Sequence, residues 1–404
     1  MRRGACLSVT ALIALGWGCL GISVGAWATE GSFLGTHDPV MEGFAGAGAA
    51  SPRSASWMLL NPASIIELDK RIDAGIDVCR THFTLRPSAL FGNPFAGEMK
   101  DNRMFYVPYG GMIWPLKKGT LGLGGYVPGA MSSNYPHSRF ILSPIRDNHG
   151  DRYMDYRHGR FVLAYAYPLD CGWALGVSGN LSTSELKTDG ITRFLLQVKH
   201  EGTRERALGV GFSVGVYKNW EKWAFGAAYT TREWSQYFDD YKDLMHRSVD
   251  MPPVFQAGIS YKLRPSLELI ADYKYIRWTE MRLFAERPAQ GGYGWRDQSI
   301  GKIAVEWKVA DDWALRAGYS RGNENVRPGF AFANAYTPVI VVDFATVGVS
   351  HTINERFDIH ASYNHMFYNS MTNSVKGDWT SPFFAGTKIG IAHDSVALGM
   401  TYKF

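Results

Sequence analysis

The chain contains the stretch Val396-Ala397-Leu398-Gly399-Met400-Thr401-Tyr402-Lys403-Phe404, in which large apolar side chains alternate with small or polar ones. Alternation with a period of two places successive side chains on opposite faces of a β-strand. One face of this strand would be apolar and the other small or polar. Such a strand suits a wall that separates lipid from a polar interior.

Fourteen segments of the chain carry this alternation. They are residues 70–80, 103–114, 119–130, 154–167, 172–187, 205–217, 222–234, 254–263, 266–278, 299–309, 312–322, 341–352, 355–367 and 392–404. Each is close to the ~9–11 residues with which a tilted strand crosses a bilayer, or somewhat longer. The pattern therefore predicts a series of membrane-spanning strands.

The connections between these segments alternate between short and long. The short ones are Pro115–Lys118, Pro168–Cys171, Lys218–Glu221, Arg264-Pro265, Ala310-Asp311 and Ile353-Asn354. The long ones are residues 81–102, 131–153, 188–204, 235–253, 279–298, 323–340 and 368–391. Outer-membrane barrels have short periplasmic turns, long outer loops and an even number of strands. The sequence therefore predicts an all-β protein, a 14-stranded antiparallel transmembrane β-barrel.

The composition agrees with this fold and excludes other classes. Of the 404 residues, 20% are charged and 14% are aromatic. Disordered chains are poor in aromatic residues, and helical membrane proteins need apolar runs of ~20 residues, which are absent after residue 28. The net charge of +5 comes without a dense block of Lys and Arg, so no nucleic-acid partner is expected.

The N-terminus has the features of a secretory signal peptide. Arg2 and Arg3 precede a largely apolar stretch from Ala5 to Val24, and Ala26-Trp27-Ala28 fits a cleavage site. We expect residues 1–28 to be removed and the protein to reach the outer membrane of a Gram-negative bacterium. An uncleaved anchor helix is the alternative.

Residues 29–69 do not alternate and are rich in Gly and Ala. A segment of this length is too short for a domain of its own and too apolar for a simple linker. We assign it as an N-terminal hatch or plug inside the lumen, followed by the barrel at residues 70–404. A periplasmic tail is the alternative.

The third predicted strand is interrupted by Pro128-Gly129. Proline lacks the N–H that a sheet needs and glycine weakens a strand interior, so this pair predicts a bulge, a kink or a broken pairing. A gap in the wall must be covered inside a bilayer. A hatch that covers it would form a side door from lumen to lipid. In the alternative interpretation, Pro128 simply ends the strand at the rim.

Four stretches resemble the FadL family of outer-membrane long-chain fatty acid transporters, which includes toluene- and xylene-uptake relatives of the TodX type. They are Gly43-Phe44-Ala45-Gly46-Ala47-Gly48-Ala49 with the following Asn61-Pro62-Ala63, then 271–278, 312–319 and 398–404. The likeness runs from end to end, although the loops do not match visibly. The sequence departs from the family at Pro52-Arg53-Ser54-Ala55-Ser56-Trp57, where an acidic, alanine-rich stretch is usual.

The resemblance implies a monomeric, hatch-plugged barrel that takes up hydrophobic compounds, with long-chain fatty acids as the expected cargo. Cargo would be captured by the outer loops, enter a lumen pocket and leave sideways, passively, at the kinked third strand. The barrel would contact outer-membrane lipid or detergent and be inserted by the barrel-assembly machinery through the strand that ends in Phe404. The implied hatch and gate residues are Gly46, Gly48, Asn61, Pro62, Ala63, Pro128 and Gly129.

A fatty acid carboxylate would need a basic partner in an apolar pocket. Arg316 and Lys302 face the predicted lumen and are the candidates, although each can instead balance Glu306 or Asp272. The outer loops also carry apolar candidates for a capture groove. These are Phe330, Phe332 and Tyr336 in one loop and Phe383 and Phe384 in another.

Three other functions remain open. Uptake of aromatic hydrocarbons fits the same fold. A lipid hydrolase is the enzyme alternative, although we expect the protein not to be an enzyme. Gly211-Phe212-Ser213-Val214-Gly215 matches G-x-S-x-G, but we interpret the match as chance, because the motif lies in mid-strand and the catalytic motif needs a strand–turn–helix. A general diffusion porin would need an open lumen. We predict no cofactor or metal, because phosphate loops and metal-ligand spacings are absent. Cys79 and Cys171 are too few for a disulfide framework.

Overall fold

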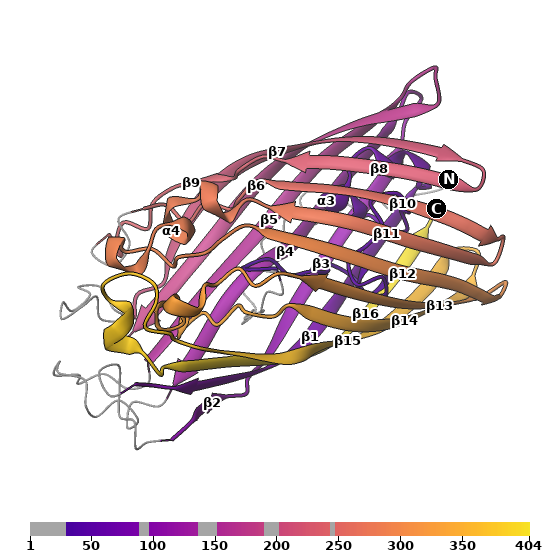
Figure 1. The fold of residues 1–404 in the computed structure, drawn as a ribbon. Helices are drawn as coiled ribbons and strands as arrows, with labels where there is room; N and C mark the ends of the chain where they lie inside the picture. Colours follow the sequence, from indigo (N-terminus) through magenta and orange to yellow (C-terminus); the bar gives the residue numbers. More distant parts are fainter. Residues whose placement is uncertain (1–29, 89–96, 136–151, 190–201, 243–246) are drawn as a thin grey trace.

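The computed structural model describes residues 30–88, 97–135, 152–189, 202–242 and 247–404. Within this part of the chain, fourteen strands form one closed antiparallel sheet (Figure 1). The predicted 14-stranded antiparallel barrel is therefore confirmed. The predicted signal peptide, residues 1–28, lies outside the described residues. No helix in the described ranges is long and apolar enough to cross a membrane.

The barrel strands have the following bounds: β1 (Arg71–Arg86), β3 (Met104–Pro115), β4 (Thr120–Tyr135), β5 (Arg152–Pro168), β6 (Trp173–Asp189), β7 (Glu205–Trp220), β8 (Trp223–Thr230), β10 (Val254–Arg264), β11 (Leu267–Ile276), β12 (Gln298–Ala310), β13 (Trp313–Gly322), β14 (Asp343–Asn354), β15 (Phe357–Thr372) and β16 (Lys388–Lys403). Two short strands, β2 (Met99–Asp101) and β9 (Trp234–Ser235), pair with β1 and β7. The barrel closes where β1 pairs with β16 in continuous register from Arg71↔Lys403 to Arg86↔Lys388.

Short helices lie in the N-terminal segment and in the long loops. The α-helices are α2 (Pro39–Gly43), α3 (Trp57–Leu60) and α4 (Arg282–Ala285). The 3₁₀ helices are η1 (Ser64–Glu67), η4 (Trp278–Glu280), η5 (Pro288–Gln290), η6 (Pro328–Phe330), η7 (Phe332–Asn334) and η8 (Ser381–Phe384). The short turns and the C-terminus gather at one end of the barrel, and the long connections gather at the other (Figure 1).

The predicted strand 222–234 is wrong beyond Thr230. There the chain leaves β10 and continues as β9 beside β7. The change occurs because Glu233 turns into the barrel, where it is fully buried, and its main chain pairs with Met251 instead of extending β8. The predicted strand 266–278 is also too long, because β11 ends at Ile276 and Trp278 begins a 3₁₀ helix. Several other strands are longer than predicted, β1 by six residues at its outer end, where lumen-facing residues such as Phe83 and Leu85 are still buried.

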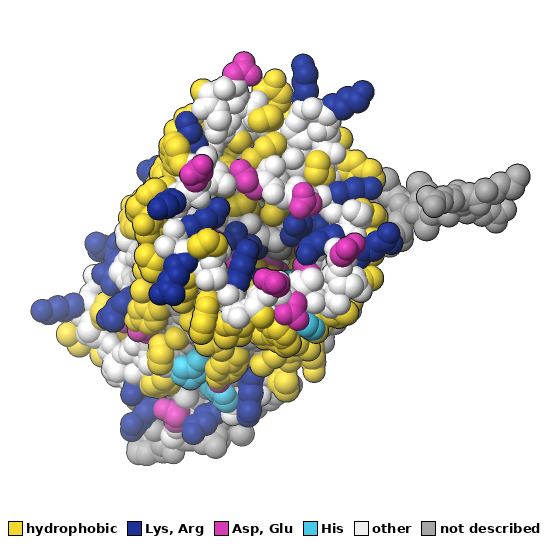
Figure 2. Space-filling model, turned by 90° about the vertical axis from the view of Figure 1, so that its right-hand side faces the viewer, with side chains coloured by type: hydrophobic (Ala, Val, Ile, Leu, Met, Phe, Trp, Pro, Cys, Tyr) yellow, Lys and Arg dark blue, Asp and Glu magenta, His cyan; other side chains and the backbone are white. Residues whose placement is uncertain are grey.

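The outer surface carries the apolar side chains of each strand. Aromatic rings mark the short-turn end, among them Trp114, Trp220, Trp223, Trp307, Trp313 and Phe404. Lys70 lies over the rings of both Trp114 and Phe404. Figure 2 looks onto this end, where Lys and Arg side chains surround the rim with acidic residues among them. Aromatic rings with cations beside them are typical of a membrane interface.

The other face of each strand points into the lumen, which is occupied by residues 30–69. We call these residues the hatch segment. Its backbone packs against lumen-facing glycines of four strands, which are Gly176 (β6), Gly226 (β8), Gly318 (β13) and Gly348 (β14), and its Asn61 and Pro62 side chains pack against Gly215 (β7). A Cβ at Gly226, for example, would lie 2.0 Å from the carbonyl oxygen of Ala49. The many glycines of the wall therefore let the hatch backbone approach it closely.

We predict that Gly226→Ala displaces the hatch segment from the wall. Because the added methyl group has no room, the variant should lose about 1–3 kcal/mol of stability and conduct ions more readily in planar bilayers. Gly301→Ala is the matched control, since a Cβ there meets nothing within 4 Å. Equal conductance and stability in the two variants would contradict the proposed contact.

Candidate functional site

Strands β3 and β4 are paired over only part of their length. Their register runs from Pro115↔Thr120 to Gly110↔Gly125 and stops there. Beyond this point β3 remains paired with β1 as far as Met104, and β4 remains paired with β5 as far as Tyr135. The wall therefore has an unpaired stretch between two neighbouring strands on the long-loop side.

Each of the two strands carries a proline within this unpaired stretch. Pro108 lies on β3 and Pro128 on β4, and neither can donate a main-chain hydrogen bond. The β4–β5 register also shifts between Tyr126 and Gly129, which is a β-bulge that bends the strand. From Tyr126 to Ser133 every residue of β4 is buried, so the outward–inward alternation ends at the bend. Pro108 was missed by the sequence analysis, although Val107-Pro108 repeats the Val127-Pro128 of the next strand.

The start of the hatch segment lies against this bend. Leu34 donates its N–H to the carbonyl oxygen of Pro128 at 2.7 Å, and Phe33 forms a bridge with Gly129. A Cβ at Gly129 would lie 2.6 Å from the carbonyl oxygen of Ser32. The hatch segment thus satisfies a main-chain acceptor at the point where β3 and β4 have separated.

Buried ion pairs hold this end of the hatch segment. The carboxylate of Glu30 contacts Lys302 Nζ at 2.6 Å and also Lys274 Nζ. Lys302 additionally donates to the carbonyl oxygen of Gly46 at 3.3 Å. Burial alone would raise the pKa of Glu30, but the charges of Lys274 and Lys302 outweigh it and hold the pKa at about 2. Glu30 is therefore ionised and bound to two strands of the wall.

A second ionic group surrounds the stretch in which the sequence departs from the FadL pattern. Arg53 pairs with Glu306 at 3.0 Å and with Glu268. The hydroxyl of Ser54 donates to Asp38 at 2.6 Å, and that carboxylate also accepts from the first amides of α2. Residues 52–57 are therefore bound to the wall by ion pairs and to the rest of the hatch segment by hydrogen bonds to a carboxylate.

The two predicted carboxylate-binding residues are already paired. Arg316 donates to Glu306 at 2.7 Å and to the hydroxyl of Ser350 at 2.6 Å. Lys302 pairs with Glu30, and not with Asp272 as the sequence alternative suggested. Asp272 instead accepts the N–H groups of Gly48 and Ala49. Both cations thus balance carboxylates in the structure, and their role in substrate binding stays a prediction that this geometry does not favour.

The predicted hatch residues form the contacts between the hatch segment and the wall. Gly46 and Gly48 have φ angles of 72° and 120°, which favour glycine. Asn61 Nδ2 donates to the carbonyl oxygens of Ala49 and Val216, both at 3.0 Å. Pro62 and Ala63 lie against Gly176 of β6. Whether these residues move during transport stays a prediction.

An aromatic cluster fills the lumen between the bend and the long loops. Trp278 and Trp295 pack edge to face with ring centroids 4.7 Å apart, and Phe284 stacks on Trp295 at 4.5 Å. Phe33 of the hatch segment reaches Trp278 at 5.6 Å. These rings are buried, so the apolar interior is continuous from the loops to the bend.

The four loop phenylalanines do not form one exposed groove. Phe330 is buried in the loop interior, whereas Phe383 is 52% exposed. Phe332 and Phe384, from different loops, stack with centroids 4.2 Å apart. The structure thus brings two of the four together directly, and the binding role of all four stays a prediction.

A Ser–His–Glu arrangement lies in the wall beside the bend. Ser184 Oγ is 2.9 Å from His158 Nδ1, and His158 Nε2 is 2.9 Å from Glu233. Hydrolases use such groups when the serine meets substrate. Here each of the three is at most 1% exposed, and Arg160 holds the other carboxylate oxygen of Glu233 at 2.6 Å. We interpret the group as an anchor for the chain after β8.

The same anchor explains the G-x-S-x-G motif of β7. Gly211 faces the lumen, and a Cβ there would lie 2.6 Å from Glu233. A Cβ at Gly215 would lie 2.1 Å from the side-chain oxygen of Asn61. Ser213 between them bonds to Thr230 at 3.0 Å. Both glycines therefore make room for inserted side chains, in a strand and not in a nucleophile elbow.

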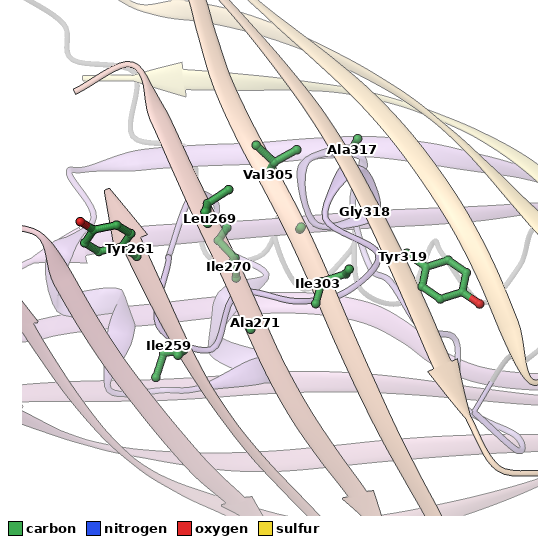
Figure 3. Close-up of a pocket in the computed structure, with 11 residues that line it drawn as sticks. Ile259, Tyr261, Leu269, Ile270, Ala271, Ile303, Val305, Ala317, Gly318 and Tyr319 are labelled. Carbon is green, nitrogen blue, oxygen red and sulfur yellow. The ribbon is translucent and has the colours of Figure 1, made fainter. Parts of the chain in front are cut away.

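An apolar groove of about 550 Å³ lies on the outer surface of β10–β13 (Figure 3). Its rim includes Ile259, Leu269 and Ile303, which are all exposed, and Ala271 and Ala317 leave the space between them. Because it faces the bilayer, this groove is separate from the lumen and from the bend.

Comparisons with known proteins agree with this architecture. A family model described as outer membrane protein transport protein (OMPP1/FadL/TodX) matches residues 36–404. The toluene transporter TodX of P. putida has a TM-score of 0.71 at 14% identity, covering 92% of this chain and 99% of that chain. A FadL homologue of Pseudomonas aeruginosa has a TM-score of 0.71 at 15% identity, covering 93% and 100%. The toluene transporter TbuX of Ralstonia pickettii has a TM-score of 0.67 at 17% identity, covering 92% and 99%. No curated protein matches the sequence.

We predict that Glu30→Gln destabilises the protein by about 3 kcal/mol at neutral pH, because Lys274 and Lys302 lose their buried carboxylate. The pKa of Glu30 is lowered from 4.5 to about 2, so its contribution is complete above pH 4.5 and is lost as the pH falls through about 2. Unfolding in detergent at several pH values measures both effects.

Glu98→Gln is the control for this experiment, because Glu98 forms an exposed pair with Lys100 at 3.9 Å and exposed pairs contribute at most about 1 kcal/mol. The interpretation of Glu30 would be wrong if its variant unfolded like the control.

Proposed function

This chain belongs to the OMPP1/FadL/TodX family of outer membrane transport proteins, and from that premise we propose that it takes up hydrophobic small molecules by passive diffusion with sideways exit between β3 and β4. The family consists of transport channels, so the protein is an outer-membrane transporter and not an enzyme. The observation that carries the proposed exit is the unpaired stretch between β3 and β4. It joins the apolar interior to the lipid-facing side of the wall.

The aromatic cluster supports the first part of the proposed path. Apolar cargo entering between the long loops meets buried rings such as Trp278 and Phe284, which exclude water. Phe33 continues this apolar surface to the bend of β4. Displacing Phe33 and Leu34 would uncover the unpaired stretch. The filled lumen argues against a general diffusion porin, which would need an open aqueous path.

The charges in the lumen bear on whether the cargo is an anionic fatty acid or an uncharged compound. Long-chain fatty acids are the cargo expected from the sequence, but Arg53, Lys302 and Arg316 are each bound to carboxylates of the protein. A fatty acid carboxylate would have to break one of these buried pairs or enter without a partner, which costs free energy. This observation favours the second candidate function, uptake of uncharged hydrophobic compounds such as aromatic hydrocarbons. Two of the three solved structures named above are those of toluene transporters.

Two further features stay proposals. We propose that the barrel acts as a monomer, since each closed barrel contains its own hatch segment and bend. We also propose that the barrel-assembly machinery recognises the C-terminal strand β16, which ends directly before Phe404 and forms the closing seam with β1.

The expected cargo preference can be tested by uptake into cells that lack their own transporter. Labelled toluene, oleyl alcohol and oleate are compared at neutral pH, the last two having the same chain and different head groups. We expect toluene and oleyl alcohol to enter several-fold faster than oleate through the intact protein. Faster entry of oleate would restore the fatty acid assignment. Failure of all three compounds, with normal protein in the outer membrane, would contradict the proposed function.

We predict that Pro128→Ala slows uptake several-fold. The new N–H allows β4 to straighten and to pair further with β3, which narrows the exit. Pro168→Ala is the control, because Pro168 ends β5 at the short turns and is exposed. If uptake were unchanged in Pro128→Ala while the amides of residues 127–135 became better protected from exchange, the bend would not be needed for transport.

A further inference from the structure

A polar pocket of about 340 Å³ opens at the long-loop end of the barrel, between the chain that follows β8 and helix α4. Its lining contains none of the residues named above for the bend or for the aromatic cluster. Its lining residues are Arg232, Tyr237, Arg247, Ser248, Asp250, Met281, Arg282 and Leu283. Three guanidinium groups from three different segments thus meet in one concave site.

Carboxylates hold two sides of this pocket without neutralising it. Arg232 binds Asp250, while Arg247 and Arg282 share Glu286. Three positive charges therefore face two negative ones. Each ion pair fixes the direction of a guanidinium group, so the pocket is organised before any ligand binds.

Several hydrogen-bond donors of the pocket are unused within the described part of the chain. Arg282 uses only Nε for Glu286, which leaves both terminal nitrogens, and its side chain is 77% exposed. Arg232 uses Nε and one terminal nitrogen for Asp250. The hydroxyl groups of Tyr237 and Ser248 also lack a partner among the residues described. An excess of guanidinium and hydroxyl donors with one net positive charge suits a phosphate group.

The position of the pocket relative to the membrane identifies the source of that phosphate. Tyr229, Phe255 and Tyr275 are directly paired neighbours on β8, β10 and β11 and face outward. They form the outermost lipid-facing aromatic row of these strands. Arg232 follows Tyr229 by three residues, about 10 Å along an extended chain. Lipid phosphates lie a few ångströms beyond the hydrocarbon, so the pocket lies at their level. The exposed Trp234 and Tyr237 flank it.

We propose that this pocket binds a phosphate group of the phosphorylated lipid of the outer leaflet, with the acyl chains against the Tyr229–Phe255–Tyr275 row. A soluble anion would use the guanidinium groups alone, whereas a lipid also covers the exposed aromatic rings next to them. Arg247 and Arg282 lie in the loops around α4, whose Phe284 belongs to the aromatic cluster. The bound lipid therefore orders the loops beside the proposed cargo entrance, a role separate from transport itself.

The test uses the purified full-length mature protein in detergent and measures binding by native mass spectrometry and by the shift of the unfolding temperature. The probes are bisphosphorylated lipid A, the same lipid after removal of both phosphates, and inorganic phosphate alone. We expect lipid A to bind and to stabilise the protein, and the other two probes to have little effect. Equal binding of the dephosphorylated lipid would overturn phosphate recognition, and equal stabilisation by inorganic phosphate would overturn the lipid as its source.

Arg282→Gln should weaken lipid A binding about tenfold, the usual effect of losing one charged hydrogen bond. This variant leaves Arg247 on Glu286, so the loop stays anchored. Arg282→Lys should bind with intermediate strength because it keeps the charge and loses the planar donors. Arg264→Gln, an exposed residue at the opposite rim, is the matched control for charge. Equal weakening by Arg264→Gln would show general attraction between charges and would overturn the site.

Discussion

Main-chain hydrogen bonding inside a bilayer is the constraint on which the rest of this structure depends. Lipid offers no donors or acceptors, so a spanning sheet must close on itself, and β1 and β16 do so in sixteen paired positions. Strands β3 and β4 depart from this rule beyond Gly110 and Gly125. Proline reduces the number of unpaired donors there, and Leu34 of the hatch segment supplies a donor to the carbonyl oxygen of Pro128. The proposed exit and the hatch segment are thus two parts of one arrangement.

A hatch inside a barrel must satisfy its own main chain as well. The wall provides space through its lumen-facing glycines and acceptors through its carboxylates. Both roles are seen around Ala49. Asp272 accepts the N–H groups of Gly48 and Ala49 at 3.1 and 2.9 Å, and Gly226 leaves the space that lets the Ala49 backbone approach the wall. The glycines therefore allow a close contact between the backbones of the wall and of the hatch segment. The polar side chains of the lumen mainly bind the hatch segment and do not line an aqueous channel.

Charge pairing limits what this lumen can bind. Glu30, Glu268 and Glu306 each neutralise cations that would otherwise attract an anionic cargo. Removing one partner of such a buried pair leaves an isolated charge, so the pairs stabilise the hatch position even where their net contribution is small. The Ser184–His158–Glu233 group is also a buried set of polar contacts that holds a segment in place. It contains the residue types of a catalytic triad, but it differs from one because substrate cannot reach it.

The sequence by itself determined the barrel and its strand number, because side-chain alternation and loop lengths are local properties that survive without tertiary information. It also marked Pro128-Gly129 as an interruption, because backbone restrictions belong to the residues themselves. Only the tertiary structure decided the rest. Pro108 becomes relevant only when β3 is placed beside β4, and β8 ends early because Glu233 reaches His158 and Arg160 on β5. Arg316 and Lys302 could be placed in the lumen from alternation, and Glu306, which pairs with Arg316, was already a candidate from the sequence. The partner of Lys302 was not, because Glu30 lies about 270 residues away in the chain. Ion pairs depend on distances between side chains, and such distances exist only once the chain has folded.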